Sequence, residues 1–206
     1  MLIESFDKIY LAELPQRLDS SAIAYDVIYQ QISELASNKP SKALGNNVFS
    51  VVDSNTHYYW VGSADGSVVD VAVSLDVVAP GSATVDLSAK NPNLIGGPPY
   101  ASDLYLIASD DLGKRVRFTS GKILSSDGIG AWRRLFKDGH VTSVYDNKLD
   151  KYVVTKVASI DDLEHYWKEH PDYQQYQYVL SEASEAAFIG ADFAIMEWKR
   201  LSGWLA

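Results

Sequence analysis

Residues 118–145 constrain the fold more than any other stretch, because a helical pattern stands there between two extended ones. Ser126 and Asp127 are favourable residues for the N-terminal cap of a helix. Apolar side chains then recur at helical spacing, namely Ile129, Trp132 and Phe136. Gly139 can adopt the left-handed conformation that ends a helix, and residues 140–145 alternate as a strand does. This order predicts a sheet on which the helix packs.

The preceding part of the chain alternates between apolar and polar residues, which is typical of strands. The extended segments cover residues 48–61, with a turn at 53–55, and then 68–78 and 83–89. Turn-forming residues separate them, so successive segments are expected to pair antiparallel. An irregular loop (90–100), a helix (101–109) and a strand (115–119) come next; after the helix at 127–137 we expect strands at 140–146 and 151–158.

Helical patterns stand at both ends of the chain. Residues 5–37 carry an apolar stripe, and residues 160–169 begin with acidic side chains that favour a helix N-terminus. A stripe of small and then large residues marks a terminal helix: Ala187, Ala191, Ala194, Trp198 and Leu201. This stripe must be covered, either by the protein's own sheet or by a second copy in a homodimer. The Tyr-rich residues 170–180 are interpreted as a partner surface or as packing against the terminal helix.

Together these patterns predict the α+β class, with a central mixed α/β sheet that is largely antiparallel in its first half and flanked by helices. We expect one domain over residues 1–158 and a C-terminal helical extension over residues 159–206 that packs on it.

Composition excludes several classes of function. The chain has no cysteine, which rules out a disulfide framework, a cysteine-ligated zinc and a cysteine nucleophile. Its formal charge of −9 disfavours binding to a nucleic-acid backbone. No apolar run reaches transmembrane length, and acidic residues stand where a signal peptide would be apolar, so we expect a cytoplasmic protein that does not bind membranes. His165 and His170 are not spaced to share a helical face, so no metal site is expected.

Three phrases carry a resemblance to a known family: DLYLIASDD at 103–111, RVRFTSGKILSSDGIGAWRRLFKDGH at 115–140 and TSVYDN at 142–147. They resemble the acetyltransferase-like proteins of tailed bacteriophages, within the GCN5-related N-acetyltransferase family. The resemblance implies an acetyltransferase-like central sheet. It also implies transfer of an acyl group from acetyl-CoA to an amine, in the cytoplasm of a host cell.

The resemblance places the cofactor loop at residues 90–100, where Lys90, Gly96, Gly97 and Tyr100 would bind coenzyme A. In the family, backbone amides of this loop and the following helix dipole bind the pyrophosphate. Here Pro98 and Pro99 follow the two glycines, and proline has no N–H to donate. If coenzyme A binds, its pyrophosphate is expected at residues 96–100, and aspartate at Gly97 is then expected to abolish binding by charge repulsion and bulk.

Trp132 stands where the family's helix carries a tyrosine that acts as general acid, and an indole cannot do so. Tyr145 and Asp127 are the predicted catalytic residues in its place. Arg133 and Arg134 are predicted to form the polar face of the helix, with clamping of a phosphate as the alternative.

Two other functions stay open. One is a catalytically inactive member of the same fold that engages a host or phage protein in an anti-defence or inhibitor role. The other, which rests on net charge alone, is an acidic inhibitor of a nucleic-acid enzyme.

Overall fold

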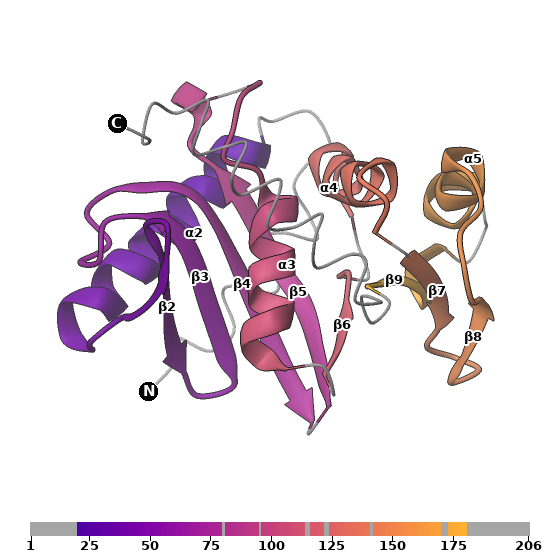
Figure 1. Ribbon diagram of the computed structural model, residues 1–206, viewed down its shortest axis with the longest axis horizontal. Helices are drawn as coiled ribbons and strands as arrows, with labels where there is room; N and C mark the ends of the chain where they lie inside the picture. Colours follow the sequence, from indigo (N-terminus) through magenta and orange to yellow (C-terminus); the bar gives the residue numbers. More distant parts are fainter. Residues whose placement is uncertain are drawn as a thin grey trace.

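The computed structural model describes residues 20–79, 81–94, 96–113, 116–121, 124–140, 142–169 and 173–180. Within these residues the chain forms a mixed, mostly antiparallel sheet of nine strands with helices on both faces (Figure 1). The predicted α+β class is therefore confirmed. The expected terminal helix with its stripe, the expected homodimer contact and the helical pattern before residue 20 lie outside the described residues.

The strands are β1 (Lys42–Gly45), β2 (Val48–Asp53), β3 (Thr56–Gly62), β4 (Val69–Ala79), β5 (Ser82–Lys90), β6 (Arg117–Thr119), β7 (Thr142–Asp146), β8 (Lys151–Val154) and β9 (Tyr176–Leu180). The helices are α2 (Ser20–Asn38), α3 (Ala101–Leu112), α4 (Ser126–Lys137) and α5 (Ile160–Glu164). Short turns of other helical types are η1 (Pro92–Leu94), η2 (His165–Glu169) and η3 (Tyr173–Gln175). No helix of the described residues is both long enough and apolar enough to pass through a membrane.

The spatial order of the strands is β1-β2-β3-β4-β5-β6-β9-β7-β8. Strands β1 to β5 form an antiparallel meander. The pairing of β2 to β5 is the one that the alternating pattern and closely spaced turns predict. The pair β5–β6 is parallel, and every later pair is antiparallel. Two antiparallel halves of the sheet therefore meet at β5 and β6.

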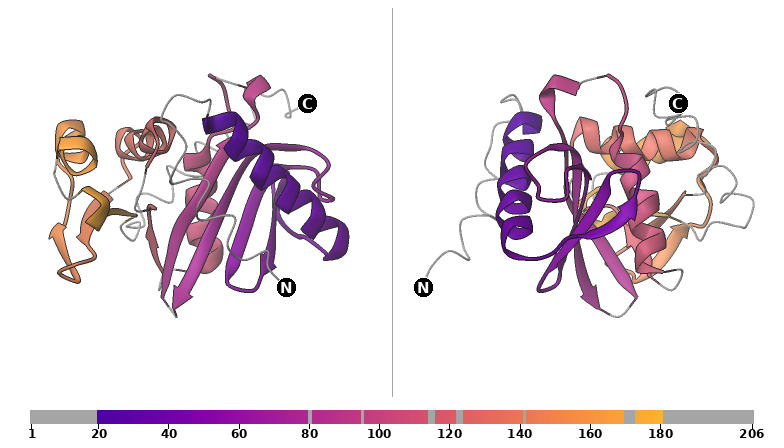
Figure 2. Two further views of the ribbon diagram at one scale, coloured as in Figure 1. Left: turned by 180° about the vertical axis from the view of Figure 1, so that it is seen from behind. Right: turned by 60° about the vertical axis from the view of Figure 1, so that its left-hand side comes forward.

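The two faces of the sheet have separate cores. On one face, Ile28 and Ile32 of α2 pack against a cluster that includes Trp60. On the other face, α3, α4 and α5 cover a larger cluster that includes Tyr105 and Trp132. The right-hand view of Figure 2 shows α2 on one side of the sheet and α3 and α4 on the other. Helices on both sides leave the central strands shielded from solvent.

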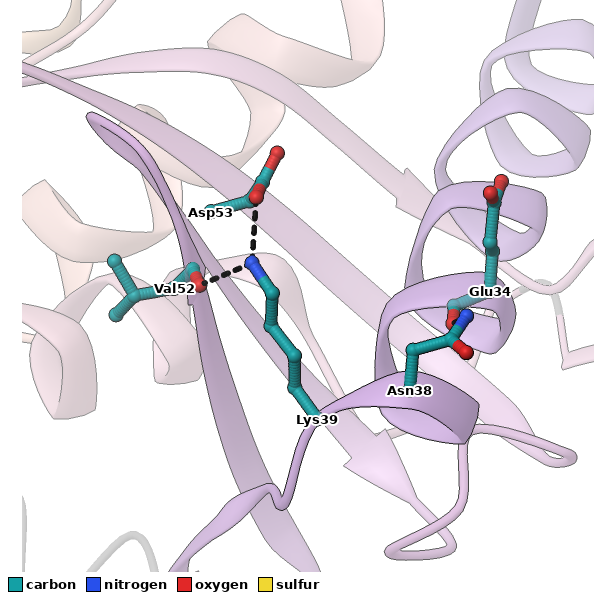
Figure 3. Close-up of polar contacts among 5 residues, drawn as sticks. All are labelled: Glu34, Asn38, Lys39, Val52 and Asp53. Atoms are coloured by element: carbon teal, nitrogen blue, oxygen red, sulfur yellow. Dashed lines mark hydrogen bonds and ion pairs between the residues drawn. The ribbon is translucent and has the colours of Figure 1, made fainter.

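The C-terminal end of α2 is tied to the sheet by polar contacts (Figure 3). Asn38 Nδ2 donates to Glu34 O at 2.8 Å, a contact within the last turns of the helix. Lys39 Nζ lies 2.6 Å from Asp53 Oδ1 and 3.4 Å from Val52 O. Because Lys39 and Asp53 are both substantially exposed, this ion pair fixes the position of the helix end more than it adds stability.

Helix α4 forms as the sequence pattern predicts, one residue earlier at its start. Ser125 is the N-cap, and its Oγ accepts a hydrogen bond from Gly128 N at 3.0 Å. Ile129 and Trp132 are fully buried on the sheet, as expected from their spacing. Gly139 has φ of +84°, and its left-handed conformation ends the helix before β7.

Residues 176–180 correct one prediction. The sequence interpretation treats the Tyr-rich stretch as a surface or packing segment inside a helical C-terminal part. In the structure these residues form β9, which lies between β6 and β7 within the sheet. Its alternating Tyr176, Tyr178 and Leu180 suit a pleated surface, but its partners are distant in sequence. A second, smaller difference is β1, a strand that precedes the first extended segment predicted from the sequence.

Candidate functional site

Strands β5 and β6 diverge after a short parallel contact. Their pairing covers only residues 82–84 of β5 and residues 117–119 of β6, whereas β5 stays paired with β4 as far as Lys90. After Thr119 the chain pairs with β9 instead of β5: the Ser120 amide donates a hydrogen bond to Tyr178 O at 2.8 Å. Residues 85–90 of β5 thus have no strand of the described chain along their second edge. We call the main-chain edge of residues 85–90 that faces away from β4 the free β5 edge; the name refers to strand pairing alone, since Asp86 has an interaction of its own.

A row of buried aromatic side chains runs beside the free β5 edge. Tyr105 of α3 donates its hydroxyl to Ser88 Oγ at 3.1 Å. Its ring centroid lies 5.8 Å from that of Trp132, which in turn lies 5.7 Å from that of Tyr178. Burial raises the pKa of Tyr105 to about 12, so this phenol stays protonated at neutral pH. The row links β5, α3, α4 and β9 and forms part of the core on this face of the sheet.

Two polar atoms in this region are buried without a hydrogen-bond partner among the described residues: Ser102 Oγ and Trp132 Nε1. Ser102 is 2% exposed and Trp132 is 0% exposed. Ser102 lies one turn before Tyr105 on the buried face of α3, so the two side chains are neighbours. An unpaired buried donor costs about 1–3 kcal/mol. Both atoms are therefore buried donors for which the described residues supply no partner.

The predicted cofactor residues gather at the N-terminus of α3. Lys90 Nζ donates to Gly97 O and lies 5.0 Å from the centre of the Tyr100 ring. The guanidinium of Arg134, from α4, lies 3.7 Å from the same centre. The Tyr100 amide donates to Asp103 Oδ2 at 3.3 Å. These residues, Lys90, Tyr100, Asp103 and Arg134, are called the α3 N-terminal cluster below.

Burial raises the pKa of the Asp103 carboxyl, and this effect outweighs the opposing influence of Arg134, the Tyr100 amide and Lys90. Burial likewise lowers the pKa of Lys90, although Asp103 and Asp70 act in the other direction. The charges of the cluster are therefore partly desolvated, which strengthens their mutual interaction.

Acetyl-CoA, the cofactor that the resemblance implies, stays a prediction. The loop suits the pyrophosphate poorly: Pro98 and Pro99 donate nothing, and the Tyr100 amide already binds Asp103. Gly96, with φ of +86°, lies in the same loop but has no described contact with the cluster.

The structure does not bring the predicted catalytic residues Tyr145 and Asp127 to the α3 N-terminal cluster: Tyr145 lies on β7, and the side chain of Asp127 is not among the described ones. Tyr145 on β7 donates its hydroxyl to Asp150 Oδ1, and the Arg117 guanidinium lies 4.1 Å from its ring centre. No contact among the described residues joins Tyr145 to the α3 N-terminal cluster. Asp127 lies in the first turn of α4, and its side chain is outside the described set. Their catalytic roles stay predictions.

The two arginines of α4, Arg133 and Arg134, contact different parts of the protein. Arg133 forms an ion pair with Glu164 of α5 at 2.6 Å, which docks the two helices. Arg134 turns to Tyr100, and its Nε lies 3.3 Å from Asp138 Oδ2 without hydrogen-bond geometry. Arg134 lies beside the predicted cofactor loop, and its role as a phosphate clamp stays a prediction; Ser102 and Asp103, which lie in the same region, were not predicted from the sequence. A carboxylate three residues into a helix is a signal for capping, but not for a site.

No group of three or more His, Asp or Glu side chains able to hold a metal ion occurs within the described part of the chain. Comparisons with protein-family models, curated proteins and solved structures found no match for the chain.

Proposed function

We propose that the chain is an acyltransferase-like protein that binds an acyl-CoA thioester, with the pantetheine arm along the free β5 edge, and passes the acyl group to an amine. The observation that carries the proposal is the pair of unpaired buried atoms, Ser102 Oγ and Trp132 Nε1, beside that edge. A strand edge binds extended, amide-bearing chains through main-chain hydrogen bonds. The pantetheine arm is such a chain.

Bound acyl-CoA supplies an activated acyl thioester. The residues of the chain hold and shield it: the free β5 edge offers main-chain donors and acceptors, and Ser102 and Trp132 offer side-chain donors. The aromatic row of Tyr105, Trp132 and Tyr178 excludes water, which limits hydrolysis of a thioester. The mixed sheet, antiparallel from β1 to β5, is compatible with the proposal.

A second function is favoured by a specific observation. The Asp103 carboxylate lies where the resemblance puts the cofactor's phosphates. A member of the fold that no longer uses acyl-CoA would offer the same free edge to an extended segment of a partner protein. This is the inactive, protein-binding alternative.

Titration calorimetry of the full chain with acetyl-CoA tests the proposal. We expect saturable binding, followed by release of free thiol when an amine acceptor is added. Absence of binding at millimolar acetyl-CoA would overturn the proposal and favour the protein-binding function. If acetyl-CoA binds but no thiol is released with any of several amines, the proposed binding site would stand and the proposed transfer reaction would be rejected.

A further inference from the structure

The α3 N-terminal cluster has the parts of an anion site. The first turn of a helix presents unpaired amides and a partial positive charge. Two cationic side chains, Lys90 and Arg134, approach the same residue, Tyr100, from β5 and from α4. Ser102 lies in the same turn, and its Oγ is buried and has no hydrogen-bond partner among the described residues.

The protein itself supplies a negatively charged group at this site, the carboxylate of Asp103. Asp103 Oδ2 accepts the Tyr100 N–H, and the charges of Arg134 and Lys90 both act on this carboxyl. The cations have further acidic neighbours as well, since Arg134 pairs with Asp138 and Lys90 interacts with Asp70. Both cations thus already have acidic side chains of the protein as neighbours, and a pyrophosphate at the Tyr100 amide would have to displace Asp103.

We infer that Asp103 is an internal substitute for the phosphate of the acyl donor, so that the chain selects acyl-pantetheine thioesters and gains little affinity from the phosphate end of the ligand. The inference rests on the proposed function for the identity of the donor. The anion site itself is independent of that proposal. Asp103 is therefore a specificity-determining residue: it disfavours phosphate without touching the thioester.

The test compares Asp103→Asn with the wild-type chain, using acetyl-CoA, S-acetyl-pantetheine and inorganic pyrophosphate as separate probes in calorimetry. For the wild type we expect the two thioesters to bind with similar affinity and pyrophosphate not to bind. For Asp103→Asn we expect about a tenfold gain for acetyl-CoA, measurable pyrophosphate binding and unchanged S-acetyl-pantetheine binding. Asp110→Asn, an exposed change on the same helix, controls for net charge.

Adding Gly97→Asp to Asp103→Asn is expected to cancel the gain, because it returns a carboxylate to the loop. A Cβ at Gly97 meets no atom within 4 Å, so this change is not expected to disturb the fold. Asp103→Ala serves as a second variant, and thermal melting verifies that every variant is folded.

Three results decide the matter. Unchanged acetyl-CoA and pyrophosphate affinity in both folded Asp103 variants would overturn the inference, as would a wild-type chain that binds acetyl-CoA far more tightly than S-acetyl-pantetheine. Pyrophosphate binding to Asp103→Asn without any thioester binding would support the internal anion and reject the proposed function.

Discussion

Replacing Trp132 by alanine is expected to lower the free energy of unfolding by about 3–5 kcal/mol, the range for removing a large buried aromatic side chain. The Trp132 side chain is fully buried and packs on Tyr105 and Tyr178, so its loss leaves a cavity between α3, α4 and β9. Urea denaturation measures the change. An alanine variant that unfolds at the wild-type urea concentration would show that α4 is not packed on the sheet as described.

The second large effect is expected on ligand binding. The double variant Ser102→Ala with Trp132→Phe removes both unpaired buried donors while retaining an aromatic ring in the core. Each lost hydrogen bond to a ligand costs about 1–3 kcal/mol, so acetyl-CoA affinity should fall by about two orders of magnitude or more. Titration calorimetry measures this loss of affinity. In the same variant the unfolding free energy should change far less than in Trp132→Ala, because Ser102→Ala removes an unsatisfied hydroxyl.

Ser120→Ala is the matched control for Ser102. Both serines are buried, but Ser120 Oγ accepts a hydrogen bond from Tyr178 N at 2.9 Å. We expect Ser120→Ala to lower stability by about 1–3 kcal/mol, since it leaves the Tyr178 amide unpaired. It should leave ligand affinity close to wild type. If Ser102→Ala and Ser120→Ala changed stability and ligand affinity equally, the paired hydroxyl of Ser120 and the unpaired hydroxyl of Ser102 would not have the different roles described here.

The elements that could be predicted from the sequence are those specified locally. Helix α4 has a serine cap, a helical apolar spacing and a glycine end, and all three lie within its own residues. The strands β2 to β5 alternate and are separated by short turns, so each pairs with its neighbour in sequence. Strand β9 could not be identified this way, because it is short and its neighbours β6 and β7 come from distant segments.

The same distinction applies to the candidate site. Lys90, Gly97 and Tyr100 lie together partly because they lie close in sequence, around one loop. Arg134 joins them only because α4 packs beside α3, and the pairing that results was not predictable from spacing. Likewise, Ser102 has no hydrogen-bond partner among the described residues because of the side chains that surround it after folding. A sequence pattern does not show which side chains those are.

Amide hydrogen exchange of residues 85–90, measured by NMR with and without saturating acetyl-CoA, tests the central claim most directly. These residues pair with β4 on one side and with no described strand on the other, so amides directed to the free β5 edge should exchange readily without ligand. Bound pantetheine should slow the exchange of those amides and leave the exchange of α2 unchanged. Saturating ligand that protects another surface, with no change over residues 85–90, would contradict the claim that the free β5 edge is the binding site.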